Sequence, residues 1–208
     1  EILMLPSDDG DYRIAENGLH IWPRGQFMFM ALPNPGGSFT CTLFAPFEGA
    51  ESFENIQTDE DVVKFYQKHF PDSIDMLPNL IEDWNANPVS SMCTVKCFPW
   101  NDGGRVALLG DSAHAIVPFY GQGMNCGFED CSILSELMDE LPEGASEERW
   151  ASLLDEYSQV RKPAADAILD LALHNYIVMR DKTGDKTYQL QKKIEARIAE
   201  AHPDKWKP

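Results

Sequence analysis

An acidic residue in the middle of the chain has the type and position of a cofactor ligand. Asp111 follows Gly110 directly after the apolar run 106–109, which predicts a short strand buried on both faces of a sheet. A carboxylate just past the end of such a strand stands where open α/β sheets bind ligands, and it can accept hydrogen bonds from a ribose hydroxyl. The same position also suits a helix cap for a segment that starts at Ser112.

A glycine-rich segment, residues 121–125, follows ten residues later and opens a predicted helix. Apolar or small side chains then recur with helical spacing, at Met124, Phe128, Cys131, Leu134 and Met138. Glycines at a helix start let a flat ligand approach the backbone, and the free N–H groups there favour a negatively charged partner such as a reduced flavin. The third glycine, Gly127, comes one residue late for the dinucleotide pattern G-x-G-x-x-G, so spacing alone leaves an ordinary strand-turn-helix corner as the alternative.

These residues together resemble the second flavin motif of the FAD-dependent aromatic hydroxylases. The matching residues are Gly110-Asp111-Ser112-Ala113-His114, Pro118 and Gly121-Gln122-Gly123-Met124-Asn125. Within that family, residues 114–130 resemble the branch that hydroxylates kynurenine. The similarity extends to residues 20–24 and 38–44, to Asn175-Tyr176 and to Met179-Arg180, and so covers nearly the whole chain.

The resemblance implies FAD as cofactor and NADPH as co-substrate. It makes Asp111 a ligand of the flavin ribitol or ribose, and it gives Met124 and Asn125 the role of presenting backbone N–H groups to the flavin ring. The cofactor-binding residues that it implies are Asp111, Pro118, Gly121, Gln122, Gly123, Met124 and Asn125.

The resemblance also implies a substrate, L-kynurenine, hydroxylated to 3-hydroxykynurenine with O2 through a flavin hydroperoxide, in tryptophan degradation and NAD biosynthesis. Because the cofactor carries this chemistry, we nominate no catalytic residue and expect His114 to be a packed, hydrogen-bonded side chain. The implied substrate-binding residues are Leu19, Ile21, Met30, Leu32, Phe44, Pro118, Phe119, Asn175 and Met179. The residues alone favour a plainer interpretation, in which the apolar members fill core and Asn175 makes a structural hydrogen bond.

The segments around the corner predict an α+β chain, a partial α/β flavoprotein hydroxylase fold. Strands are expected over 19–22, 27–32, 38–44 and 92–98, the first three in an antiparallel sheet. Thr58 and Asp61 predict a capping box for a helix that ends near Phe70, and a weaker helical stretch follows over 74–84. Later helices start at Ser146, with a kink or restart at Pro163, and run over 189–201.

We expect three parts along the chain. These are an antiparallel substrate-binding domain with helices over 1–100, the second part of the FAD-binding domain over 101–140 and a C-terminal helical region over 141–208. The chain begins at Glu1 without a methionine, and the upstream G-x-G-x-x-G unit of the resembled family is not in it. We therefore expect a portion of a longer enzyme that is inactive by itself.

Composition narrows the function classes. The 208 residues carry a net charge of −17, which argues against nucleic acid and anionic membrane surfaces as partners. The five cysteines are odd in number and form no C-x-x-C pair, which indicates a reduced compartment and no zinc site. The resemblance implies the cytoplasm, or the mitochondrial outer membrane for a eukaryotic member, which adds a C-terminal anchor; this chain has no apolar run long enough to span a bilayer.

Two other functions stay open at this point. One is a related flavin hydroxylase that acts on another aromatic acid. The other is a non-catalytic binding module that kept the fold and lost the cofactor.

Overall fold

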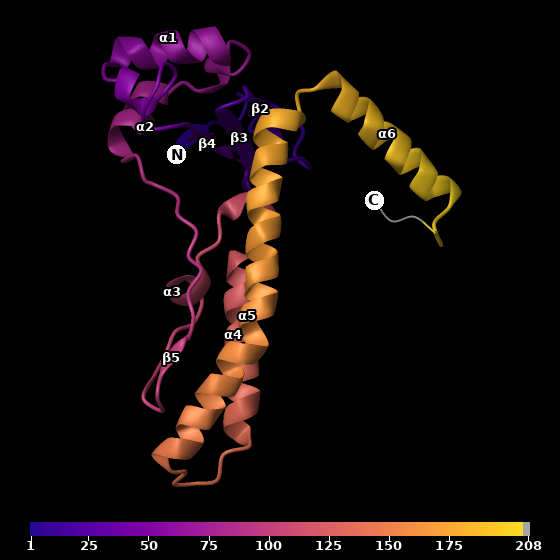
Figure 1. Ribbon diagram of the computed structural model, residues 1–208. Helices are drawn as coiled ribbons and strands as arrows, with labels where there is room; N and C mark the ends of the chain where they lie inside the picture. The colour runs from indigo at the N-terminus through magenta and orange to yellow at the C-terminus, as the bar shows by residue number, and fades with distance from the viewer. Residues whose placement is uncertain (206–208) are drawn as a thin grey trace. The chain divides into compact units, whose positions relative to one another are not determined.

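The computed structural model describes residues 1–205, which divide into two compact units. Within the described residues, the sheet unit comprises 1–89 and 178–205, and the helical unit comprises Ser90–Ile177. Figure 1 shows the course of the chain through both. The last residues of the predicted C-terminal region, Trp206 to Pro208, lie outside the described residues. The three-part division of the chain stays a prediction.

The sheet unit is built on an antiparallel sheet with the strand order β1-β4-β3-β2. Its strands are β1 (Ile2–Met4), β2 (His20–Pro23), β3 (Met28–Pro33) and β4 (Phe39–Phe44). The first three predicted strands and their antiparallel pairing are thereby confirmed. The β3–β4 turn depends on Gly37, because its φ is +88° and a Cβ there would lie 2.7 Å from the Gly10 carbonyl oxygen.

The sheet has two different faces. Phe29, Ala31 and Cys41 point into the main core, where they pack with α1 (Asp59–His69) and α2 (Leu80–Ala86). Ile21 and Met30 are cross-strand partners on the opposite face. Alternation places Leu32 and Phe44 on that same face, as the sequence predicted for Met30 and Leu32.

The helices of the sheet unit follow the predicted signals. The Thr58 hydroxyl accepts the Asp61 N–H at 3.2 Å and the Asp61 carboxylate accepts the Thr58 N–H at 3.0 Å, which confirms the capping box. The weaker stretch is a 3-10 turn, Ile74–Met76, followed by α2. Further 3-10 and π-helical turns lie at η1 (Phe53–Asn55) and η4 (Val178–Lys182), and α6 (Lys186–Ala201) buries none of its side chains.

Substituting Thr58→Ala tests the capping box. We expect the free energy of unfolding to fall by about 1 kcal/mol, since one of the first N–H groups of α1 loses its partner. Urea unfolding of the full-length protein measures this change. Glu60→Gln is the matched control, because Glu60 lies in the same turn and its one ion pair among the described residues is with the exposed Lys64. Equal effects of the two substitutions would contradict the capping role.

The helical unit contains the predicted corner. Its elements are β5 (Asn101–Asp102), β6 (Val106–Ala107), α3 (Asp111–His114), η3 (Pro118–Tyr120), α4 (Gly123–Asp139) and α5 (Glu147–Ile177). A core of Trp100, Ala113, Cys126, Tyr157 and Ala165 joins these elements.

Two strand predictions in this unit are wrong. Residues 92–98, all of them described, form no strand, since the Val95 N–H makes a single bond to the Ala115 carbonyl at 3.1 Å rather than a ladder. The run 106–109 is a strand only over Val106–Ala107, and Val106 is 52% exposed. Within residues 1–205 this strand pairs with β5 alone, and a two-stranded ribbon cannot bury its members on both faces.

Two features of the long helices also differ from the sequence patterns. α5 continues through Pro163 as one helix, because Tyr157 and Ala165 pack into the same core on either side of the proline. α4 forms as predicted, but Met124 and Phe128 are 71% and 63% exposed, and its buried residues are Cys126 and Asp130. The inward face of α4 is therefore partly polar.

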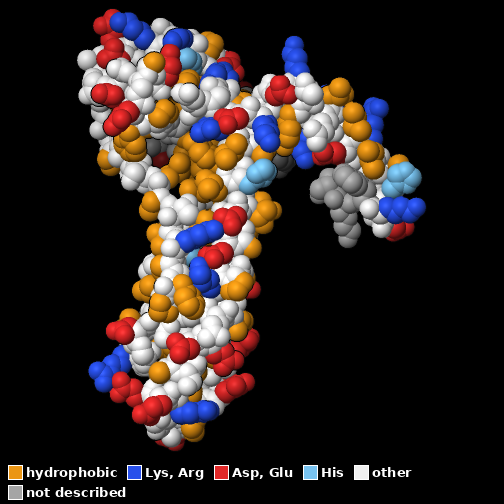
Figure 2. All heavy atoms as spheres, in the orientation of Figure 1, with side chains coloured by type: hydrophobic (Ala, Val, Ile, Leu, Met, Phe, Trp, Pro, Cys, Tyr) orange, Lys and Arg blue, Asp and Glu red, His pale blue; other side chains and the backbone are white. Residues whose placement is uncertain are grey.

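The surface shows charges of both signs. Figure 2 shows acidic and basic side chains interspersed over the visible face, so the net charge of −17 is not gathered there in one patch. None of the helices within residues 1–205 is both long and apolar enough to cross a bilayer.

Candidate flavin site

The Asp111 carboxylate is available to a ligand. Asp111 is exposed at the first position of α3, and within residues 1–205 its side chain makes no hydrogen bond or ion pair. The neighbouring Ser112 hydroxyl donates to the Leu109 carbonyl at 2.7 Å. The N-cap of α3 is Gly110, which has no side chain, so Asp111 does not take the alternative role of a cap.

The start of α4 has the geometry of an anion-binding site. Gly121 adopts the left-handed conformation with φ +65°, and a Cβ at Gly121 or Gly123 would meet nothing within 4 Å. The Gln122 side chain accepts from the Asn125 amide at 3.0 Å and does not cap the helix. Among the described residues, the first backbone N–H groups of α4 therefore lack helical partners, and they fit a flavin edge that carries negative charge.

A hydrogen bond and a ring stack connect the predicted substrate residues of the helical unit. Phe119 stacks on Tyr176, with ring centroids 4.4 Å apart and planes at 27°. The Asn175 amide donates to the Phe119 carbonyl at 2.5 Å. The structural hydrogen bond inferred for Asn175 from the residues alone is thus confirmed, whereas its contact with a substrate stays a prediction. Phe119 is 6% exposed and Pro118 is exposed.

The other predicted substrate residues belong to the sheet unit. Leu19 precedes β2 and is exposed, as is Leu32, whereas Met30 and Met179 are buried. Ile21 and Phe44 are partly buried on the second face of the sheet. Their roles toward a substrate also stay predictions.

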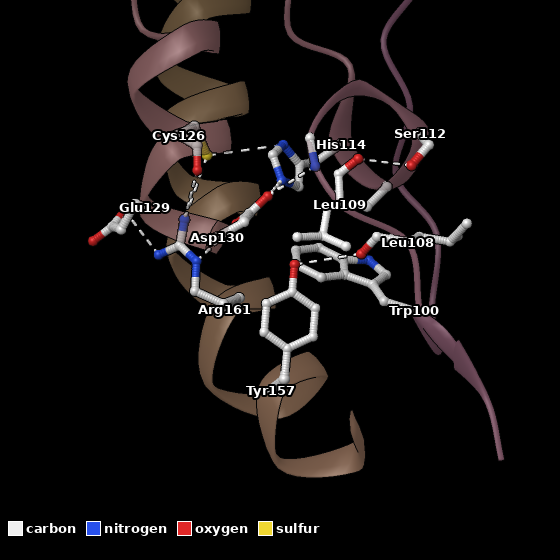
Figure 3. A network of polar contacts seen from close by, with 12 residues as sticks. Trp100, Leu108, Leu109, Ser112, His114, Cys126, Glu129, Asp130, Tyr157 and Arg161 are labelled. Carbon is white, nitrogen blue, oxygen red and sulfur yellow. Dashed lines mark hydrogen bonds and ion pairs between the residues drawn. The ribbon is translucent and has the colours of Figure 1, made fainter. Parts of the chain in front are cut away.

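Behind the corner lies a buried charge network that the sequence did not reveal. Figure 3 shows Asp130 of α4 between His114 of α3 and Arg161 of α5. Its Oδ2 accepts from His114 Nε2 at 2.5 Å and from the Gly110 N–H at 2.9 Å, and its Oδ1 accepts from Arg161 Nε at 2.8 Å. Asp130, His114 and Arg161 are 0%, 1% and 3% exposed. His114 is therefore the packed, hydrogen-bonded residue that we expected.

Hydrogen bonds favour the ionised form of Asp130 in this buried network. Burial opposes ionisation of Asp130, but the bonds from His114, Gly110 and Arg161 outweigh it, and the carboxyl pKa lies below its ordinary value of 3.8. Burial raises the pKa of the Cys126 thiol, whose sulfur lies 3.8 Å from His114 Nδ1. Because a carboxylate can only accept, the ring nitrogen Nε2 of His114 is the donor in its bond to Asp130.

Three members of the network resemble a metal ligand set. Ligand atoms of His114, Cys126 and Asp130 lie within 4.8 Å of one another. Arg161 already neutralises the carboxylate, and its guanidinium lies 3.6 Å from the Cys126 sulfur. A divalent ion would stand beside this buried cation, so the described residues give no reason to propose a metal centre here.

Acid should weaken the fold through Asp130. A carboxyl whose pKa is lowered on folding stabilises the native state above its unfolded pKa of about 3.9, and the stabilisation is lost as pH falls below that value. We expect the stability gap between the full-length protein and its Asp130→Asn variant to be widest near neutral pH and to shrink below about pH 4. Urea unfolding across this range measures the gap. A gap that stays constant to pH 2.5 would contradict an ionised Asp130.

Comparison with known proteins shows which proteins this chain is similar to. A family model described as FAD binding domain matches residues 17–172. The chain is 49% identical over 208 residues to a kynurenine 3-monooxygenase of Christiangramia forsetii, covering all of this chain and 45% of that protein. It is 49% identical over 207 residues to the kynurenine 3-monooxygenase of Flavobacterium psychrophilum, covering 99% of this chain and 45% of that protein.

Solved structures give the same fold. Klebsiella pneumoniae HpxO, complexed with FAD and uric acid, superposes with a TM-score of 0.60 at 18% identity, covering 94% of this chain and 47% of that one. This chain thus spans a little under half the length of the relatives that it matches.

Proposed function

The chain belongs to the FAD binding domain family, and from that premise we propose that the full-length protein is an FAD-dependent monooxygenase that hydroxylates L-kynurenine to 3-hydroxykynurenine with NADPH and O2. One observation carries the proposal. The chain is 49% identical, over its whole length, to a kynurenine 3-monooxygenase. The exposed Asp111 and the uncapped start of α4 support it, because both fit the polar groups of FAD.

In this proposal the helical unit binds the cofactor. FAD supplies the redox chemistry that activates O2, which side chains cannot supply. Asp111 accepts hydrogen bonds from the ribitol or ribose hydroxyls. Gly121 and Gly123, on either side of Gln122, leave the backbone open for the ring. Met124 and Asn125 offer their N–H groups at the positive end of α4. Pro118 borders the ring on the substrate side.

Substrate binding in this proposal uses apolar side chains and the 3-10 turn η3, which contains Phe119. Phe119 contacts the aromatic ring of L-kynurenine, and its place is set by the Tyr176 stack and the Asn175 hydrogen bond. Asn175 is the residue of this group that reaches the polar end of the substrate. The resemblance also assigns substrate contacts to residues of the sheet unit, namely Leu19, Ile21, Met30, Leu32, Phe44 and Met179.

The test uses the full-length protein. Its visible spectrum should show bound flavin, and L-kynurenine should stimulate NADPH oxidation with formation of 3-hydroxykynurenine, identified by mass. Bound flavin without a response to L-kynurenine would contradict this substrate and favour another aromatic acid. Absence of bound flavin would favour the non-catalytic binding module.

We also propose a cytoplasmic location for the protein. All five cysteines are free, which suits a reducing compartment. Cell fractionation tests this, and recovery of the protein with the membranes would contradict it.

A further inference from the structure

We propose that Asp130 is a positioning residue for the flavin site, which fixes the short helix α3 and thereby the place of the Asp111 carboxylate. The inference rests on the proposed function, since it assigns a role toward FAD. Asp130 itself is fully buried. It acts through Gly110, which immediately precedes Asp111, and through His114, the last residue of α3.

One carboxylate oxygen joins both ends of α3. Oδ2 of Asp130 accepts the Gly110 N–H at 2.9 Å, immediately before Asp111, and His114 Nε2 at 2.5 Å, at the last residue of the helix. The Gly110 carbonyl accepts the Ala113 and His114 N–H groups at 2.9 and 3.0 Å. A helix of four residues has too few internal bonds to be stable alone, so these outside contacts hold it in one position.

The conformation of Gly110 makes this contact possible. Its φ of +57° and ψ of −139° belong to a region that only glycine adopts readily. In this conformation its N–H bonds Asp130 while its carbonyl starts α3. Gly127 on α4 packs beside Gly110, since a Cβ built at Gly127 would be in ordinary van der Waals contact with the Gly110 Cα at 3.8 Å.

The other carboxylate oxygen fixes Asp130 itself. Oδ1 accepts from Arg161 Nε at 2.8 Å, so α5 holds the side chain on the side away from His114 (Figure 3). Arg161 Nη1 also pairs with Glu129 at 2.8 Å, a residue whose side chain is 59% exposed. Asp130 and Glu129 are therefore adjacent acids that share one partner, but only Asp130 reaches Gly110.

This difference supplies a matched pair of variants. Apoprotein is prepared from the full-length enzyme and titrated with FAD, with quenching of flavin fluorescence as the signal. We expect Asp130→Asn to raise the Kd for FAD at least tenfold and Glu129→Gln to change it less than threefold. Both variants are first shown to be folded by circular dichroism. A folded Asp130→Asn protein with unchanged FAD affinity would overturn the proposal.

A double-mutant cycle separates positioning of Asp111 from a general loss of structure. If Asp130 acts through Asp111, the Asp130→Asn effect on the Kd should largely disappear in an Asp111→Asn background. Full additivity of the two substitutions would overturn the proposal while leaving the role of Asp111 intact. An Asp111→Asn protein with normal FAD affinity would overturn both the role of Asp111 and the proposal, whereas a wild-type protein that binds no FAD would overturn the proposed function.

His114→Asn keeps the test decisive if Asp130→Asn does not fold. It removes the bond at the end of α3 and leaves Asp130 paired with Arg161 and Gly110. We expect a rise of at least threefold in the Kd for FAD, again suppressed by Asp111→Asn. An unchanged Kd in this folded variant would also overturn the proposal.

Discussion

Replacing Asp111 by Asn in the full-length protein should lower its affinity for FAD by about 10- to 100-fold. A hydrogen bond to an ionised group contributes about 1.5–3 kcal/mol, and each 1.4 kcal/mol is a factor of ten in Kd. The substitution should not destabilise the fold, because the carboxylate is exposed and makes no hydrogen bond or ion pair within residues 1–205. Titration of the apoprotein with FAD measures the change.

The neighbouring Ser112→Ala variant is the control for Asp111→Asn. Ser112 lies in the same turn, and its hydroxyl donates to the Leu109 carbonyl. Its substitution therefore perturbs α3 locally and leaves the Asp111 charge in place. We expect its Kd for FAD to change less than threefold. Equal effects of the two variants would mean that the turn, rather than the carboxylate, determines FAD affinity.

Replacing Arg161 by Met should lower the free energy of unfolding by about 3–5 kcal/mol. The substitution leaves the Asp130 carboxylate buried without its countercharge, and removal of one partner of a buried ion pair costs far more than loss of an exposed pair. Urea unfolding of the full-length protein measures the loss. The matched control is Glu129→Gln, which removes the exposed partner of the same guanidinium and should change stability little.

A double variant sharpens the Arg161 prediction. Asp130→Leu combined with Arg161→Met removes both buried charges and should be more stable than Arg161→Met alone, since no charge remains unpaired. Its FAD affinity should stay low, because the bonds to Gly110 and His114 are lost. A double variant less stable than Arg161→Met would contradict the ion-pair account.

Local signals in the sequence predicted much of the fold. Thr58 and Asp61 gave the start of α1, and apolar alternation gave the strands and the face that carries Ile21 and Met30. The capping box and the strand alternation both depend on contacts between residues that are close in sequence or on adjacent strands. The motif from Gly110 to Asn125 located the corner for the same reason.

The errors came from partners distant in sequence. The apolar run at Val106 predicted a buried strand, but burial depends on neighbours that the run itself does not specify. Pro163 predicted a kink or restart of the helix, whereas α5 runs through it without a restart, with Tyr157 and Ala165 packed into one core. In both cases tertiary contacts, rather than local preference, determined the result.

Asp130 was missed although a signal for it existed. It lies four residues after Cys126 and so shares the inward face of α4, where a carboxyl group needs a buried partner. That partner, Arg161, is on another helix 31 residues later, and spacing does not pair them. Sequence reasoning could have marked Asp130 as unusual without identifying what it binds.

The most direct test of the account is a structure of the full-length protein with FAD and L-kynurenine bound. We predict a ribitol or ribose hydroxyl within about 3 Å of the Asp111 carboxylate, the flavin ring at the start of α4 and the substrate ring against Phe119. Asp130 should still bond Gly110 and His114. FAD bound elsewhere, with Asp111 facing solvent, would contradict the assignment of this corner as the flavin site.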